Sequence, residues 1–267
     1  MLEAVSLMKS LQNNNNIVFA VHTIDGSVVM LEELVSHLNS RVYGLQCSKD
    51  APLESLEELA TIHISKIKLI QSTGPFKIVG YSFRASVAFE IALQMEKQNE
   101  EVELVLLDGS PRWKYLVDIS DGETLQDQWE NAILLGFLNQ YLRSNSPIVY
   151  RELAKSQPFE DKRNYTAKVL HESFPNICLE EIKVLISSFY ARAECGKKYE
   201  PSSKVKAKTV LIKATANKLS WNLPQDYGLT DICEEQLDII EVEGNHYCFY
   251  ENPLKLCLPD ILNKILD

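Results

Sequence analysis

The stretch KIVGYSFRASVAFE, residues 77–90, decides the fold of this chain. It begins as a short apolar strand, turns at Gly-Tyr-Ser-Phe and continues at once with the apolar spacing of a helix. A serine on such a sharp strand-to-helix turn, a nucleophile elbow, exposes its hydroxyl at the top of a sheet. The usual pattern is G-x-S-x-G, and here the last glycine is replaced by Arg84. The stretch therefore predicts Ser82 as a nucleophile and leaves Arg84 to be explained.

Other apolar runs of strand length lie on both sides of this stretch, and helical patterns separate several of them. The runs are residues 17–21, 42–47, 102–107, 210–213 and 239–242. Continuous apolar runs are typical of strands that are buried on both faces of a sheet. Alternation of strands and helices is typical of a mostly parallel sheet with helices on both faces. We therefore expect an α/β fold with a mostly parallel central sheet.

The alternation stops between residues 113 and 200. This segment has helical periodicity, for example over residues 132–138, and little strand pattern. It is expected to be an all-helical cap inserted into a core made of residues 17–112 and 201–267. Residues 1–16, which end in a tract of four asparagines, are expected to be a linker or a disordered start.

A serine nucleophile needs a general base, and the base needs an acid that orients it. In hydrolases with a nucleophile elbow the chain order is serine, acid, histidine, and two histidines follow Ser82. His171 falls inside the helical segment. His246 falls in a loop after the last strand and before the last helix, where the carboxyl edge of the sheet would present a base. This placement favours His246 over His171, and over a loop histidine that only bonds the backbone.

The predicted acid is Asp108, which ends the apolar run 102–107 directly after the helix of the nucleophile. The more common position follows the next strand, at about residues 214–217, but no carboxylate stands there before Asp226. Asp108 also begins the turn-forming sequence Asp-Gly-Ser-Pro, and a turn role is compatible with a catalytic one.

An oxyanion hole should use the backbone N–H of Phe83, the residue after the nucleophile, and a second N–H from the loop after an early strand. Residues 21–27 form such a loop, and Gly26 allows it to turn. His22 in this loop is expected to shape it through a hydrogen bond, and not to act as a base or a ligand.

Composition and motif content bear on the partners, location and cofactors that the chain could have. The net charge is −10 and the isoelectric point about 5.1, which argue against nucleic acid as the main partner. Six cysteines without C-x-x-C spacing predict reduced thiols and a cytoplasmic location. No apolar run is long enough to span a membrane, and residues 1–12 do not resemble a signal peptide. The sequence also lacks metal-ligand spacing and nucleotide-binding motifs, so we expect neither a metal nor a bound cofactor.

Five stretches together resemble the thioesterase domain at the end of animal-type fatty acid synthase, a type I thioesterase of the α/β-hydrolase superfamily. They are HTIDGS (22–27), VYGLQC (42–47), GYS (80–82) with VAFE (87–90), LDGSP (107–111) and EGNH (243–246). The likeness extends from about residue 17 to the end of the chain and is weakest across the helical segment. Thioesterase domains of polyketide and peptide synthases share the elbow and the fold but match the other stretches less well.

The resemblance implies an activity and a partner. The reaction would be hydrolysis of a long-chain fatty acyl thioester on the phosphopantetheine arm of an acyl carrier protein of the same megasynthase, releasing free fatty acid. Ser82 would be the nucleophile, His246 the general base and Asp108 its orienting acid. Ile24 and Phe83 would supply the oxyanion N–H groups. The substrate carries its own phosphopantetheine, so the resemblance adds no bound cofactor.

Two alternatives to this activity stay open, and the first of them depends on Arg84. Its side chain could point into solvent at the mouth of the site, contact the phosphate of the carrier arm, or distort the elbow. Distortion would leave a catalytically impaired acyl-binding or carrier-docking domain. A carboxylesterase or lipase with the same three residues is the other alternative, because the triad alone does not distinguish oxygen esters from thioesters.

Overall fold

The computed structural model describes residues 5–10, 16–47, 55–112, 125–142, 147–216 and 224–267. The chain divides into two compact units. Unit 1 contains Met1–Leu116 and Gly196–Asp267, and unit 2 contains Val117–Cys195. The sequence predicted these boundaries four or five residues away, at 112/113 and 200/201, and residues 113–124 around the first boundary lie outside the described part.

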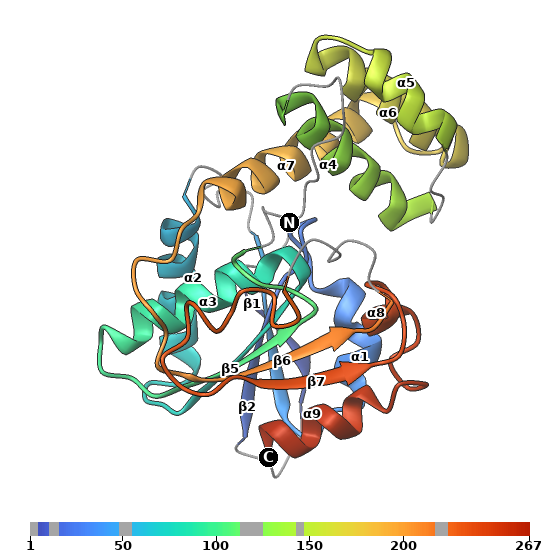
Figure 1. Cartoon of the computed structure of the whole chain (residues 1–267). Helices are drawn as coiled ribbons and strands as arrows, with labels where there is room; N and C mark the ends of the chain where they lie inside the picture. Colours follow the sequence, from blue (N-terminus) through green and yellow to red (C-terminus); the bar gives the residue numbers. More distant parts are fainter. Residues whose placement is uncertain (1–4, 11–15, 48–54, 113–124, 143–146, 217–223) are drawn as a thin grey trace. The chain divides into compact units, whose positions relative to one another are not determined.

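In the residues that the structure describes, unit 1 contains a seven-stranded sheet of order β1-β3-β2-β4-β5-β6-β7, and some of its strands are labelled in Figure 1. The strands are β1 (Val5–Lys9), β2 (Ile17–Val21), β3 (Arg41–Leu45), β4 (Phe76–Tyr81), β5 (Val102–Leu107), β6 (Lys208–Ala214) and β7 (Asp238–Val242). Every neighbouring pair is parallel except β1 with β3. The predicted α/β fold with a mostly parallel sheet is therefore confirmed, and the carboxyl ends of the parallel strands lie at one edge.

Strand β1 corrects the expectation of a linker over residues 1–16. Residues 5–9 pair antiparallel with β3, with Val5 opposite Leu45 and Leu7 opposite Tyr43. The strand was missed because it lies at the edge of the sheet and none of its residues is fully buried. An edge strand gains its order from the ladder with its neighbour, so its sequence need not show a continuous apolar run. Residues 1–4 and 11–15 of the expected linker lie outside the described part.

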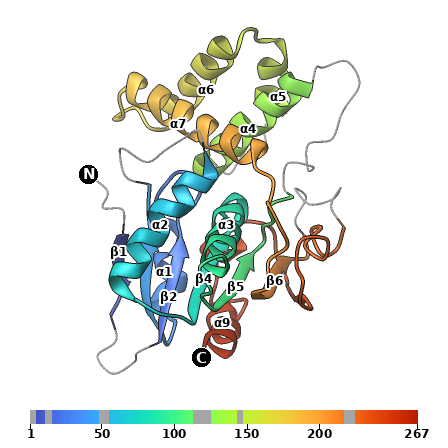
Figure 2. The ribbon, with the colours of Figure 1, turned by 90° about the vertical axis from the view of Figure 1, so that its left-hand side faces the viewer.

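Helices cover both faces of the sheet. On one face α2 (Leu56–Ile70) and α3 (Ala85–Glu96) lie side by side (Figure 2). The other face is covered by α1 (Glu32–Ser36), α8 (Cys248–Glu251) and α9 (Leu258–Leu266), which share one apolar core with the sheet. Two short 3-10 helices, η1 (Val29–Leu31) and η2 (Ser82–Arg84), precede α1 and α3. Ser55 is the N-cap of helix α2, and its hydroxyl accepts a hydrogen bond from the backbone N–H of Glu58 in the first turn.

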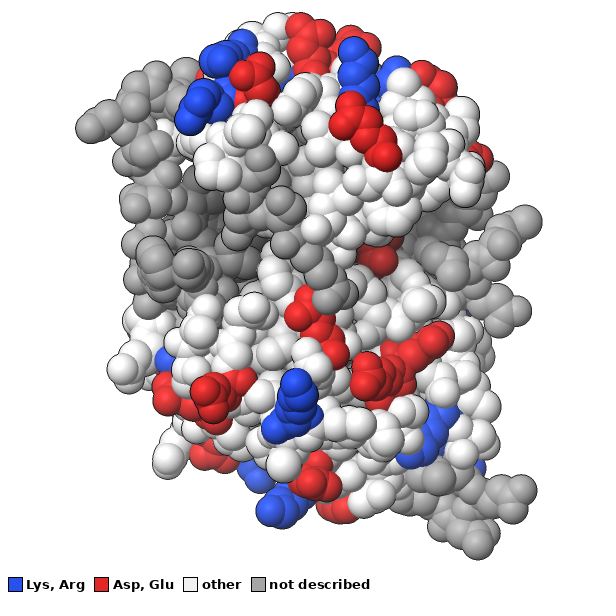
Figure 3. Space-filling view, turned by 90° about the vertical axis from the view of Figure 1, so that its right-hand side faces the viewer, with Lys and Arg blue, Asp and Glu red and all other residues white. Residues whose placement is uncertain are grey.

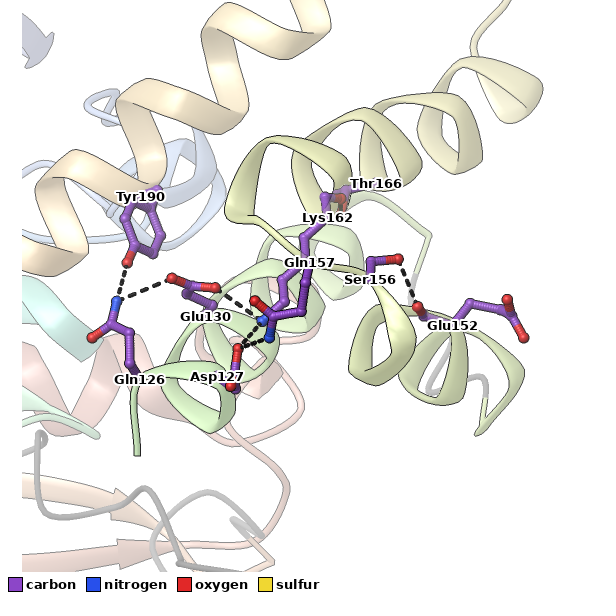
Figure 4. Close-up of polar contacts among 9 residues, drawn as sticks. All are labelled: Gln126, Asp127, Glu130, Glu152, Ser156, Gln157, Lys162, Thr166 and Tyr190. Carbon is purple, nitrogen blue, oxygen red and sulfur yellow. Dashed lines mark hydrogen bonds and ion pairs between the residues drawn. The ribbon is translucent and has the colours of Figure 1, made fainter. Parts of the chain in front are cut away.

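The described residues of unit 2 are mostly helical, as the periodicity predicts. The helices are α4 (Leu125–Leu142), α5 (Pro147–Lys155), α6 (Phe159–Ser173) and α7 (Leu179–Lys198), and α7 ends within unit 1. A buried lysine links α6 to α4 (Figure 4): Lys162 Nζ lies 2.8 Å from Asp127 Oδ1 and 2.9 Å from Glu130 Oε2. Burial by itself would lower the pKa of Lys162, but the hydrogen bonds to Asp127 and Glu130 outweigh it and raise that pKa.

Two observations concern the hydropathy of the helices and the charge on one face. In the part of the chain that the structure describes, no helix is both long enough and apolar enough to cross a membrane. On the face seen in Figure 3, the described Lys and Arg side chains are interspersed with Asp and Glu. Interspersed charges of both signs are typical of a solvated surface, whereas a nucleic-acid site concentrates basic residues.

Candidate active site

The elbow has the geometry that its sequence predicts. Strand β4 ends at Tyr81, and Ser82 takes a φ of 57°, in the left-handed region that residues other than glycine rarely adopt. The turn is tight on both sides. A Cβ on Gly80 would lie 2.6 Å from the Cβ of Ala88, and a Cβ on Gly109 would lie 2.0 Å from the carbonyl oxygen of Ser82. The sharp turn therefore depends on the small residues Gly80 and Gly109 around the serine.

The structure brings Ser82, His246 and Asp108 into one hydrogen-bonded chain. Ser82 Oγ lies 2.6 Å from His246 Nε2, and His246 Nδ1 lies 2.6 Å from Asp108 Oδ2. Because an ionised carboxylate only accepts, Nδ1 carries the proton toward Asp108 and Nε2 is left to accept the hydroxyl proton of Ser82. The side chain of Asp108 is fully buried, whereas that of His246 is 13% exposed. This arrangement can convert the serine hydroxyl into a nucleophile.

The carboxylate of Asp108 is held from two further directions. Its Oδ1 accepts hydrogen bonds from the hydroxyl of Tyr227 at 2.8 Å and from the backbone N–H of Ala214 at 3.0 Å. The backbone N–H of Asp108 donates to the carbonyl of Ile212 at 2.7 Å. Although Asp108 follows β5, these bonds fasten it to the end of β6, beside the more common position of the acid. Sequence reasoning missed Tyr227, since nothing in the segment between β6 and β7 marks it.

Tyr81 holds His246 and was also missed. Its hydroxyl donates to the backbone carbonyl of His246 at 2.7 Å, and the two rings stack with centroids 5.0 Å apart. Burial raises the pKa of Tyr81 well above its usual value, so the phenol stays protonated as a donor. Nearby, burial and then the charge of Asp108 raise the pKa of the Cys248 thiol to about 11. The neutral Cys248 thiol therefore does not compete with Ser82 as a nucleophile.

The loop predicted to carry the second oxyanion donor is a closed turn. Gly26 N–H donates to the carbonyl of Thr23 at 2.9 Å, with Ile24 inside the turn and Gly26 at a φ of 92°. His22 is fully buried, and its Nδ1 lies 2.6 Å from the carbonyl of Thr23 while its Nε2 lies 3.1 Å from Cys47 Sγ. The expectation that His22 shapes the loop through a hydrogen bond is confirmed. Phe83, the other proposed donor, directly follows Ser82 in η2.

The other residues singled out in the sequence are also placed. His171 lies at the end of α6 in unit 2, where its Nδ1 is 3.0 Å from the carbonyl of Ile177. Arg84 is 1% exposed, which excludes the first of its three possible placements, a side chain in solvent, and burial also argues against the second, contact with a carrier phosphate. The guanidinium lies over the ring of Phe83, 4.8 Å from its centroid. Distortion of the elbow is likewise not observed, because Ser82 and His246 remain in hydrogen-bond contact. Within the described residues, no three His, Cys, Asp or Glu side chains are arranged to hold a metal ion.

A protein-family model described as a thioesterase domain matches residues 16–257. Among curated proteins, atromentin synthetase greA of Suillus grevillei is 24% identical over 257 residues, covering 89% of this chain and 25% of the relative. Malpinin synthetase of Mortierella alpina is 36% identical over 99 residues, covering 35% of this chain and 1% of the relative. The chain thus spans about a quarter of the length of the first of these relatives, and far less of the second.

Solved structures agree on the fold. A four-domain nonribosomal peptide synthetase bound to AMP and glycine has a TM-score of 0.81 at 17% identity, covering 98% of this chain and 20% of that one. The thioesterase domain that cyclises the lipopeptide antibiotic surfactin has a TM-score of 0.65 at 20% identity, covering 99% of this chain and 96% of that one. The named relatives are synthetases, so the similarity extends to thioesterase domains of synthetases and does not single out the animal fatty acid synthase type.

Proposed function

This chain belongs to the family of thioesterase domains, and from that premise we propose that it is a serine hydrolase acting on acyl thioesters carried by a phosphopantetheine arm. The observation that carries the proposal is the unbroken chain of hydrogen bonds from Ser82 through His246 to Asp108. The partner we propose is an acyl carrier protein domain of the same polypeptide, since the relatives are several times longer than this chain. We also propose a reducing, cytoplasmic location, which the six cysteines support, since all of them lie in the described residues and none forms a disulfide bond.

The first half of the reaction forms an acyl-enzyme. His246 Nε2 takes the proton of the Ser82 hydroxyl as Oγ attacks the thioester carbonyl carbon. The negative charge that develops on the carbonyl oxygen is stabilised by the backbone N–H groups of Phe83 and Ile24. The carbon–sulfur bond then breaks, and the imidazolium gives its proton to the leaving pantetheine thiolate. Asp108 stabilises the charged imidazole throughout and keeps its proton on Nδ1.

The second half uses water. His246 removes a proton from the water as its oxygen attacks the acyl carbon, and the same proton returns to Ser82 Oγ as the ester bond breaks. The products are a free carboxylic acid and the regenerated serine. We assign a long-chain fatty acyl group as the substrate because of the sequence resemblance to animal-type fatty acid synthase thioesterases. The competing substrate class is a carrier-bound product of a synthetase like the atromentin and nonribosomal peptide synthetases that this chain resembles.

The position of Arg84 argues against the acyl-binding alternative. A non-catalytic domain would need a disrupted elbow, whereas Ser82 Oγ is 2.6 Å from His246 Nε2 with Arg84 in place. The carboxylesterase and lipase alternative shares the triad and differs in the substrate atom that leaves. A thioesterase and an oxygen-ester hydrolase must therefore be distinguished by comparing a thioester substrate with an oxygen-ester substrate.

The test is hydrolysis of palmitoyl-CoA and of p-nitrophenyl palmitate by this chain, with Ser82→Ala as the control. We expect hydrolysis with a kcat/KM that favours the thioester, and loss of activity in the control. Preference for the oxygen ester would support the esterase alternative. Activity that survives in Ser82→Ala, or a folded protein that hydrolyses neither ester and does not react with a fluorophosphonate, would reject the proposed function.

A further inference from the structure

A buried cation stands two residues after the nucleophile in the chain. Arg84 is the last residue of η2 and the N-cap of α3, and its side chain is 1% exposed. Its guanidinium carbon is 4.8 Å from the centroid of the Phe83 ring. A desolvated cation over an aromatic face is attracted by the quadrupole of the ring. Arg84 therefore restrains the side chain of the residue whose backbone N–H is proposed to bind the oxyanion.

The Phe83 ring is also confined by helix α7. A Cβ on Gly196 would lie 2.1 Å from Cζ and 2.3 Å from Cε2 of that ring. The ring edge is thus packed directly on the backbone at Gly196, which belongs to unit 1, at a point where only glycine leaves room. With Arg84 over its face and Gly196 against its edge, Phe83 has little freedom to move.

The same cation is linked to the loop of the second oxyanion donor. Burial, and then the charge of Arg84, lower the pKa of His63 to about 3, so this buried imidazole stays neutral beside the guanidinium. The ring of His63 is 5.8 Å from that of His22, which is bonded to the carbonyl of Thr23 at the start of the Ile24 turn. Arg84, His63 and His22 thus form a buried group that extends from one proposed oxyanion donor toward the other.

We propose that Arg84 is a positioning residue for catalysis, and that its buried positive charge holds Phe83 so that the N–H of that residue meets the developing oxyanion. The inference rests on the proposed function, because Phe83 matters in this way only if an oxyanion forms at Ser82. It gives a use to the residue that breaks the G-x-S-x-G pattern. A displacement of the donor by about 1 Å would cost on the order of a hundredfold in rate.

The experiment compares Arg84→Met, which removes the charge and keeps an unbranched chain, with Arg84→Lys, which keeps the charge. Arg151→Met, an exposed arginine of α5 in unit 2, is the matched control. For palmitoyl-CoA hydrolysis we expect Arg84→Met to lower kcat at least about tenfold with KM within about twofold, and Arg84→Lys to recover most of that loss. The split between kcat and KM, and rescue by lysine, would not follow from a merely structural role.

A second variant and a second readout keep the inference testable. Gly196→Ala displaces the Phe83 ring but leaves the charge of Arg84 in place, and it should also lower kcat. If Arg84→Met does not fold, Gly196→Ala and Arg84→Lys together test whether Arg84 positions Phe83. The rate at which a fluorophosphonate labels Ser82 should rank the variants in the same order as their kcat values. This readout does not depend on the natural substrate.

The inference is overturned if folded Arg84→Met matches the wild type in kcat and labelling rate, or if Arg84→Lys loses as much as Arg84→Met. It is likewise overturned if, with Arg84→Met unfolded, folded Arg84→Lys loses activity or folded Gly196→Ala keeps wild-type kcat. If the wild-type chain neither hydrolyses a thioester nor is labelled, the proposed function fails, and this inference fails with it.

Discussion

Gly109 offers a direct test of how much the site depends on the space around the elbow. Its alanine variant would place a Cβ 2.0 Å from the carbonyl oxygen and 2.7 Å from the carbonyl carbon of Ser82. The first of these is about 1.4 Å short of the 3.4 Å at which ordinary van der Waals contact begins. The obstructing atoms belong to the backbone, so no change of side-chain rotamer relieves the overlap. Gly109 does not have a positive φ, and alanine is therefore excluded by space and not by backbone conformation.

The size of the effect follows from what must move. Either the Ser82 peptide shifts away from Gly109, or residue 109 shifts and takes the neighbouring Asp108 with it. A misplacement of about 1 Å in either group costs on the order of a hundredfold in rate. We therefore expect Gly109→Ala to lower kcat for thioester hydrolysis about a hundredfold. Overpacking should also lower the free energy of unfolding by about 1–3 kcal/mol.

The assay is kcat and KM for palmitoyl-CoA, with the rate of fluorophosphonate labelling as a readout that does not depend on the acyl substrate. Gly136→Ala is the matched control, because nothing lies within 4 Å of a Cβ placed at that position in α4. We expect the control to keep wild-type activity and to gain up to about 1 kcal/mol in stability from helix propensity. A folded Gly109→Ala protein with kcat and labelling rate within about threefold of the wild type would refute the reasoning, because it would mean that a 1 Å shift at the elbow is harmless.

Three further predictions concern single side chains. Tyr227→Phe removes a donor to the buried carboxylate of Asp108 and should lower kcat roughly tenfold and stability by about 1.5–3 kcal/mol, measured by steady-state kinetics and thermal unfolding; unchanged values would exclude this orienting role. In the folded protein the pKa of His63 is about 3, against an ordinary value of 6.5. Below pH 6.5 the imidazole must therefore lose its proton when the chain folds, and the free energy of unfolding falls as the pH drops from 6.5 toward 3. The loss should be about 2 kcal/mol between pH 6.5 and 5, and urea unfolding should show it in the wild type but not in His63→Leu; equal pH dependence in both would contradict it. Lys162→Met leaves two carboxylates of α4 without their buried cation and should destabilise unit 2 by about 3–5 kcal/mol, with partial recovery in acid as they protonate; a melting curve like that of the wild type would show that the ion pairs contribute nothing.

The parts of this molecule that sequence predicts well are those with a local signal. The run 102–107 is a strand in the structure over the same residues, because helices cover both faces of the sheet and a strand buried on both faces needs apolar side chains on each. The order of serine, acid and histidine along the chain also points to three side chains that the structure brings into one hydrogen-bonded chain, since the carboxyl ends of parallel strands lie at one edge of the sheet. Strand β1 has no comparable signal in its sequence. It pairs with β3 along one edge only, and none of its side chains is fully buried, so no run of apolar residues is needed.

The supporting residues were missed for a different reason. Tyr227 meets Asp108 across 119 positions of the chain, and Tyr81 meets the carbonyl of His246 across 165. Neither tyrosine stands at a position with a pattern, since one is in an irregular segment and the other is the variable residue of the elbow motif. Their roles follow from the fold as a whole and become visible only when the distant segments are brought together.

Arg84 shows which part of the elbow motif is a physical requirement in this chain. The final glycine of G-x-S-x-G is expected where the turn must approach its surroundings closely, which is why distortion is one of the three outcomes that the sequence leaves open for an arginine there. The close approaches in the structure lie elsewhere, at Gly80 against Ala88 and at Gly109 against the carbonyl of Ser82. The side chain of Arg84 instead extends over Phe83 and into the neighbourhood of His63. In this elbow a small residue is therefore required at positions 80 and 109, where an added Cβ would overlap neighbouring atoms, and not at position 84. A local rule broken at a functional site is often compensated by its surroundings. In this chain the compensation comes from an aromatic face and a neutral buried imidazole, which make room for the cation beside the nucleophile.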